Sequence, residues 1–159
     1  MIKQNRKTQA ALFGGILSML VGGQALAEDG KAYPGTLCVE NLPEAITYSA
    51  TGSARNLASR AVRWICPAVR DGATASTDIN DWDVTVNRRG NSDLWEIFLR
   101  SSNPSGTSFF QSAITVPGGN ATQTLDGGSI TSSFNLGPYF ITSLVPPNAE
   151  LFSYQVTES

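Results

Sequence analysis

The chain of 159 residues carries 11 basic and 13 acidic side chains, a formal net charge of −2, and no histidine. Without histidine, a Ser-His-Asp triad, a histidine general base and the usual zinc hydrolase sites are excluded. The sequence contains no basic cluster, which argues against nucleic acid or an anionic membrane surface as a partner.

Residues 1–27 have the pattern of a secretory signal peptide. Three basic residues lie within the first seven, an apolar run covers 10–23, and Ala25 and Ala27 fit the −3 and −1 positions of a signal peptidase site. The 14-residue run is shorter than the roughly 20 residues that a membrane-spanning helix needs. We therefore predict cleavage after Ala27, a secreted or periplasmic protein, and no membrane span once the signal is removed.

Removal of the signal leaves 132 residues, 28–159, which is enough for a single domain. Three basic residues leave with the signal, so eight basic and 13 acidic side chains remain, a net charge of −5.

The domain keeps two cysteines, Cys38 and Cys66. A nucleophilic cysteine needs an imidazole or another cation beside it, and we expect the nearby Arg63 and Arg70 to face solvent. Two thiolates without histidine make a poor zinc site, and the spacing is too wide for a Cys-x-x-Cys redox pair. An even cysteine count in an exported chain favours a disulfide, which should stabilise the fold by about 3–4 kcal/mol.

Short runs rich in β-branched and aromatic residues, separated by glycine and proline, predict strands through most of the domain. Trp82, Val84 and Val86 alternate with polar residues, as on a half-buried strand. The predicted strands cover 61–66, 82–87, 94–100, 130–136, 139–145 and 151–156. The segment 94–100 is apolar on both sides, which is typical of an interior strand.

Other segments connect these strands. Residues 54–61 have the propensity for two helical turns at most. Residues 88–93 resemble a hairpin loop, and 117–133 is rich in loop-forming residues. We predict an all-β domain of about eight strands, folded as a two-sheet antiparallel sandwich of jelly-roll or immunoglobulin-like character, with a closed barrel as the alternative.

Several short motifs resemble a family of small exported bacterial proteins of unknown function. They are Tyr33-Pro34-Gly35-Thr36-Leu37-Cys38, Cys66-Pro67 before Arg70-Asp71, and Pro146-Pro147 before Phe152-Ser153-Tyr154-Gln155-Val156-Thr157-Glu158. The resemblance implies a disulfide-linked fold and export but no activity. Such proteins often carry a second cysteine pair near positions 96–98 and 142–143. Here we expect apolar packing by Trp95, Ile97, Phe98, Phe140 and Ile141 to replace it.

Oxygen ligands are concentrated in Asp78-Ile79-Asn80-Asp81-Trp82-Asp83. Such ligands suit calcium, but the frame of an EF-hand loop is missing. The alternative is a polar turn before a strand.

Glu96 with Asp83 or Asp93 is the one carboxylate arrangement that suggests glycoside hydrolysis. The alternative places Glu96 on a solvent-facing strand position.

Trp64, Trp82 and Trp95 suggest two roles, as platforms for sugar rings or as core residues. We expect Trp82 and Trp95 in the core, and the pattern does not decide for Trp64. The sequence thus predicts a non-catalytic binding or surface-associated protein with a glycan or protein ligand, and it assigns no catalytic, cofactor or metal residue. A small carboxylate-based glycan hydrolase or a carbohydrate-binding module is the alternative.

Overall fold

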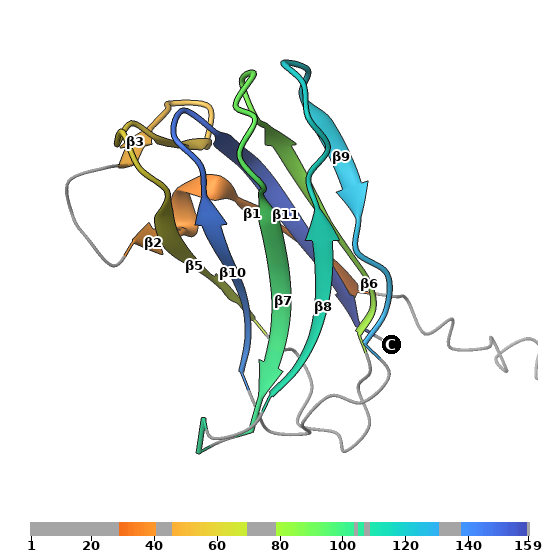
Figure 1. Cartoon of the computed structure of the whole chain (residues 1–159). Helices are drawn as coiled ribbons and strands as arrows, with labels where there is room; N and C mark the ends of the chain where they lie inside the picture. The colour runs from red at the N-terminus through yellow and green to blue at the C-terminus, as the bar shows by residue number, and fades with distance from the viewer. Residues whose placement is uncertain are drawn as a thin grey trace, which may run out of the picture.

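The computed structural model describes residues 29–40, 46–69, 79–103, 105–106, 109–130 and 138–158, which form two antiparallel sheets packed as a sandwich (Figure 1). The six-stranded sheet contains β1 (Asp29–Pro34), β3 (Ile46–Tyr48), β4 (Ala54–Asn56), β6 (Ile79–Asn87), β9 (Gln123–Asp126) and β11 (Glu150–Glu158). The five-stranded sheet contains β2 (Val39–Glu40), β5 (Val62–Ala68), β7 (Glu96–Ser102), β8 (Phe109–Thr115) and β10 (Tyr139–Val145). A short 3-10 helix, η1 (Gly35–Leu37), follows β1.

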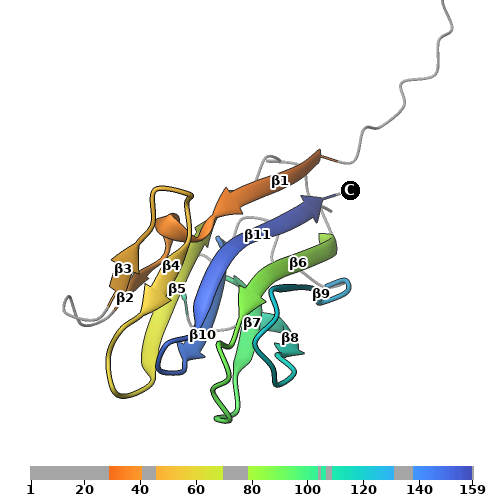
Figure 2. The ribbon, with the colours of Figure 1, turned by 90° about the horizontal axis from the view of Figure 1, so that it is seen from above.

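The strand order is β3-β4-β11-β6-β9 in the larger sheet and β2-β5-β10-β7-β8 in the smaller one. In the larger sheet, β11 pairs with β6 along one edge and with β4 and β1 in turn along the other. Figure 2 shows β1, β11 and β6 side by side in that layer. The two-sheet antiparallel sandwich is thus confirmed, with 11 strands among the described residues. No described strand belongs to both sheets, so the closed-barrel alternative is wrong.

Successive strands mostly alternate between the two layers, and this makes one expected hairpin wrong. Residues 88–93 connect β6 in the larger sheet to β7 in the smaller one, so they cross between layers instead of joining paired neighbours. Later in the chain, β7 and β8 do pair directly. Neither β8 nor β9 was predicted, and β9 lies within the loop-rich segment 117–133. Of the predicted strand 130–136, Ile130 forms a bridge with Ile79, and 131–136 lie outside the described residues.

The helical propensity of residues 54–61 is overridden by sheet pairing. Residues 54–56 form β4, between β3 and β11, and the chain then turns through 57–61 into β5. The buried Asn56 directs this turn, because its Nδ2 donates to the Val145 carbonyl at 2.8 Å and the Arg60 carbonyl at 3.0 Å. Its Oδ1 accepts from the Ala58 backbone N–H at 2.8 Å. An asparagine that satisfies backbone groups in this way competes with helix formation.

The core lies between the sheets and contains all three tryptophans. Trp64, Trp82 and Trp95 are 0%, 1% and 0% exposed, which confirms the core assignment of Trp82 and Trp95 and decides it for Trp64. Burying an aromatic ring of this size contributes at most about 4–6 kcal/mol from its area. The Trp95 indole N–H also donates to the Ser143 hydroxyl at 2.6 Å.

The predicted disulfide between Cys38 and Cys66 is present. Cys38 follows η1, Cys66 lies on β5, and their Cα atoms are 4.0 Å apart. Both sulfurs are buried in the core cluster. The bond therefore ties the N-terminal segment to the second strand of the smaller sheet.

The positions expected to replace a second cysteine pair do lie opposite each other. Phe98 pairs with Thr142, and Ile97 pairs with Ser143. The expected apolar packing is correct for the buried Trp95, Ile97 and Ile141. It is wrong for Phe98 and Phe140, which lie on the outer surface of the sheet.

The predicted signal peptide 1–27, its cleavage site after Ala27, and Arg70 lie outside the described residues. In the part of the chain that the structure describes, no helix has the length and apolar character needed to cross a bilayer.

Candidate ligand-binding face

Alternating burial along β5, β7 and β10 divides their side chains between the core and the outer surface of the five-stranded sheet. This outer surface, the open face, lies on the side of the sheet away from the six-stranded layer. Its described residues are Val39, Arg63, Ile65, Pro67, Glu96, Phe98, Arg100, Gln111, Ala113, Thr115, Phe140, Thr142 and Leu144.

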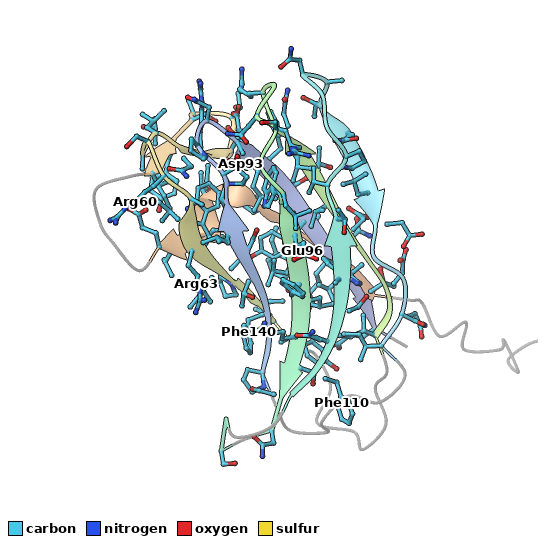
Figure 3. The ribbon with its side chains drawn as sticks, in the orientation of Figure 1. Arg60, Arg63, Asp93, Glu96, Phe110 and Phe140 are labelled. Carbon is cyan, nitrogen blue, oxygen red and sulfur yellow. A yellow bond between two sulfur atoms is a disulfide. The ribbon has the colours of Figure 1, made fainter. Side chains whose placement is uncertain are left out.

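Two phenylalanine rings lie near the centre of the open face. Phe98 on β7 is opposite Thr142, and Phe140 on β10 is opposite Arg100, so the rings are diagonal neighbours on adjacent strands. Side chains in this relation lie about 7–8 Å apart, within reach of aromatic rings. Figure 3 shows Phe140 standing out from the sheet on the same side as Arg63. Both rings are half-buried, so part of each remains accessible.

Large aliphatic side chains lie beside the rings, on strands β2, β5 and β10. Val39, Ile65 and Leu144 are 59%, 38% and 55% exposed. Val39 and Ile65 are direct register partners, and Leu144 lies on the neighbouring strand, opposite Arg63. Single exposed apolar residues are common, whereas several on one face beside aromatic rings mark an interaction surface.

Two arginines frame this apolar centre. The Arg100 Cζ atom lies 5.4 Å from the centre of the Phe98 ring, a cation–π contact. Arg63 is exposed on β5, as expected from the sequence. Burial lowers the pKa of Arg100, and the positive charge of Arg63 lowers it further. Arg63 is opposite Leu144 and Arg100 is opposite Phe140, so the two arginines lie on the strands that flank β10, four positions apart along it.

The carboxylate arrangement suggested for glycoside hydrolysis is not assembled around Glu96. Glu96 is exposed on the open face, and its register partner is Thr115. Asp83 lies on the outer surface of the opposite sheet, so the Glu96–Asp83 pair is excluded by the topology. Asp93 is in the loop before β7, as Figure 3 shows. Glu96 is thus a solvent-facing strand residue, the alternative that the sequence also suggested.

Sugar stacking on tryptophan is also excluded, because the three indoles are in the core. Among the described side chains, the aromatic rings that are accessible on the open face are Phe98 and Phe140. The sequence analysis expected both to pack in the interior in place of a second cysteine pair. The alternation of Ile97, Phe98 and Leu99 could have separated them, since a strand in a two-layer sandwich buries one side only.

The outer surface of the six-stranded sheet is acidic. Asp83 is opposite Asp126 on β9, and Asp81 lies two positions earlier on the same strand. Partial burial raises the pKa of Asp83, and the charges of Asp81 and Asp126 raise it further. Residues 79–83 are part of strand β6, so the expected turn before a strand is wrong there, and Asp78 lies outside the described residues. Among the described residues, no three acidic or cysteine side chains are placed to hold a metal ion.

A polar network closes one end of the sandwich. Glu150 is buried, accepts from the Ser53 hydroxyl at 2.6 Å, and forms an ion pair with Arg89. Burial alone would raise the pKa of Glu150, but the hydrogen bonds from Ser53 and Arg89 and the charges of Arg89 and Arg55 outweigh it. The pKa of Glu150 therefore lies below its usual value. This network joins the residue before β4, the loop after β6 and the first residue of β11.

Comparisons with known proteins identify the fold. No protein-family model matches the sequence, and no curated protein does. The xylan-binding module CBM15 superposes with a TM-score of 0.56 at 12% identity, over 82% of this chain and 96% of that module. The C-terminal CBM6 of the laminarinase LamC from Zobellia galactanivorans gives 0.53 at 8% identity, over 81% and 99%.

A third similar structure is the GH26-CBM35 β-(1,4)-mannanase of Podospora anserina, with a TM-score of 0.54 at 12% identity. The match covers 83% of this chain but spans 28% of the mannanase. At these identities the similarity establishes a shared β-sandwich fold.

Proposed function

We propose that this protein is a non-catalytic carbohydrate-binding domain whose ligand lies on the open face. The observation that carries the proposal is the pair of accessible rings, Phe98 and Phe140, on adjacent strands of an exposed sheet surface. The three similar structures described above each are, or contain, a carbohydrate-binding module, which supports this use of the sandwich.

The chemistry of the open face suits a sugar chain. Each sugar ring has an apolar C–H surface and a hydroxyl-bearing edge. The phenylalanine rings can cover the C–H surface. Hydrogen-bond acceptors and donors for the hydroxyl groups come from Glu96, Gln111 and Thr115. If each ring removes about 40–60 Å² of apolar area from water, it contributes about 1–1.5 kcal/mol, or roughly tenfold in affinity.

The proposed setting is outside the cytoplasm. The disulfide between Cys38 and Cys66 is typical of proteins that fold in an oxidising compartment. Mass spectrometry of protein recovered from the envelope or medium should find a chain that begins at Glu28 and lacks free thiols. A retained leader would contradict the export hypothesis without bearing on ligand binding.

Affinity electrophoresis through gels that contain soluble polysaccharides tests the binding proposal. The unaltered protein should be retarded by at least one polysaccharide. Phe98→Ala and Phe140→Ala should each restore most of its mobility.

Phe110→Ala is the matched control. Phe110 is 41% exposed but lies opposite the inward-facing Ser101, so it belongs to the other side of the sheet from Phe140 (Figure 3). Loss of retardation in all three variants, or in none of them, would refute the assignment of the ligand to the open face.

A further inference from the structure

We propose that the ligand of the open face is an anionic polysaccharide, with carboxylate-bearing sugar units held between Arg63 and Arg100. This inference rests on the function proposed above and specifies the class of glycan.

Charge is distributed unevenly over the two outer surfaces of the sandwich. The described part of the six-stranded sheet presents Asp81, Asp83 and Asp126 on its outer surface. Among its described residues, the open face presents two arginines and one carboxylate, that of Glu96. The chain as a whole is acidic. A polyanion approaching the domain is therefore repelled by one surface and attracted to the other.

The arginines lie beside the rings. Arg100 contacts the Phe98 ring and is the register partner of Phe140 on the next strand. Arg63 lies on β5, on the other side of β10 (Figure 3). A ligand that covers the rings lies beside Arg100, and one that extends across β10 towards Leu144 also reaches Arg63.

Both arginines carry positive charge, and the charge of Arg63 adds to burial in lowering the pKa of Arg100. An anionic ligand on this face is attracted by both charges. Guanidinium groups bind carboxylate through two parallel N–H···O bonds, and a sugar carboxylate attached to a ring that stacks on Phe98 or Phe140 provides such an anion. A sulfated polysaccharide offers the same negative charge and is separated from the carboxylated class by the experiment.

The experiment compares uronic-acid polysaccharides with their methyl esters, which keep the backbone and lose the charge. The probes are polygalacturonate, alginate and glucuronoxylan, each in both forms, with dextran sulfate as the sulfated probe and xylan as the neutral one. Binding is measured by calorimetry at about 0.05 and 0.5 M NaCl, since screening weakens exposed charge pairs. We expect esterification to weaken binding of at least one polysaccharide about tenfold or more, and high salt to weaken the charged form only.

Substitutions assign the effect to these side chains. Arg63→Gln and Arg100→Gln should each weaken binding of the acid form about tenfold and leave binding of the ester unchanged. Glu96→Gln should strengthen binding of the acid form severalfold, a gain that a damaged fold cannot produce. Arg60→Gln and Asp93→Asn are the matched controls, because both residues are exposed in loops outside the open face (Figure 3).

The outcomes separate the two proposals. If acid and ester bind equally and the phenylalanine variants alone lose affinity, the anionic class is wrong and the binding function stands. If dextran sulfate alone binds, the carboxylate assignment is overturned. If no polysaccharide binds, and the protein self-associates through a surface that Leu144→Glu disrupts, the open face belongs to a second copy of the chain and both proposals fail.

Discussion

Reduction of the Cys38–Cys66 disulfide should remove a large part of the stability of the domain. The cysteines are 28 residues apart in sequence, and closing a loop of that length lowers the entropy of the unfolded chain by an amount worth about 3.6 kcal/mol. For the 132 residues that follow the predicted signal, the entropy of unfolding is about 0.28 kcal/mol per kelvin. The midpoint of thermal unfolding should therefore fall by about 13 °C.

The assay is urea unfolding of the oxidised and reduced protein, followed by tryptophan fluorescence. Comparing redox forms of one sequence keeps both sulfur atoms in the core, so the difference reports the cross-link and not a cavity. Alkylation under denaturing conditions and mass spectrometry confirm the redox state of each sample. A reduced protein within about 1 kcal/mol of the oxidised one would show that the unfolded chain is already restricted, and the entropic argument would then be wrong.

Four further predictions concern the rest of the fold. Gly127→Ala should destabilise the domain by about 1–3 kcal/mol in a urea titration, because a Cβ at that position would lie 2.0 Å from the indole of Trp82. Gly118→Ala is the control and should have little effect, because a Cβ there would lie 3.9 Å from its nearest neighbour. Asp83→Asn should stabilise the protein by a few tenths of a kcal/mol at pH 7. Because the folded-state pKa of Asp83 is raised, this gain should vanish at acidic pH, where the carboxyl group is protonated. A gain that stays constant with pH would contradict the repulsion of Asp83 by Asp81 and Asp126. Glu150→Gln should lower the free energy of unfolding by about 1–3 kcal/mol at pH 7. The pKa of Glu150 is lowered in the folded state, so its ionised form contributes stability that is lost as the pH falls. The difference in stability between variant and parent should therefore shrink below about pH 4.5. Acrylamide should quench the fluorescence of the folded protein weakly, because all three indoles are buried, and strong quenching would place one of them at the surface.

The alternation of side chains made the layer architecture predictable. Trp82, Val84 and Val86 repeat at every second residue, and burial of all three follows directly. The disulfide was predictable because the chain offers two cysteines and no group that would make either of them reactive. Residues 139–145 were predicted with the same bounds that β10 has in the structure.

Strand pairing was not predictable from the same pattern. Residues 88–93 have the composition of a hairpin loop, but nothing local shows whether the next strand joins the same sheet or the facing one. The helical propensity of 54–61 was outweighed by contacts with β11, almost a hundred residues later in the chain. Tertiary contacts of this range leave no local signal in a single sequence.

The candidate site was missed for a related reason. Phe98 and Phe140 lie in apolar runs, and hydrophobicity alone assigns such residues to the core. Successive side chains of a strand point to opposite faces of the sheet. Ile97 and Ile141 point inward, so their neighbours Phe98 and Phe140 point outward. Arg63 was predicted to face solvent, but its place on the same face as Arg100 depends on the pairing of both their strands with β10.

Strand β11 holds the larger sheet together. It pairs with β1, β4 and β6, and its register joins Asp29 to Glu158. Among the described strands, β1 has no other pairing partner, and without β11 the pairs β3–β4 and β6–β9 are separate from each other. A chain cut before residue 150 therefore cannot assemble the larger sheet.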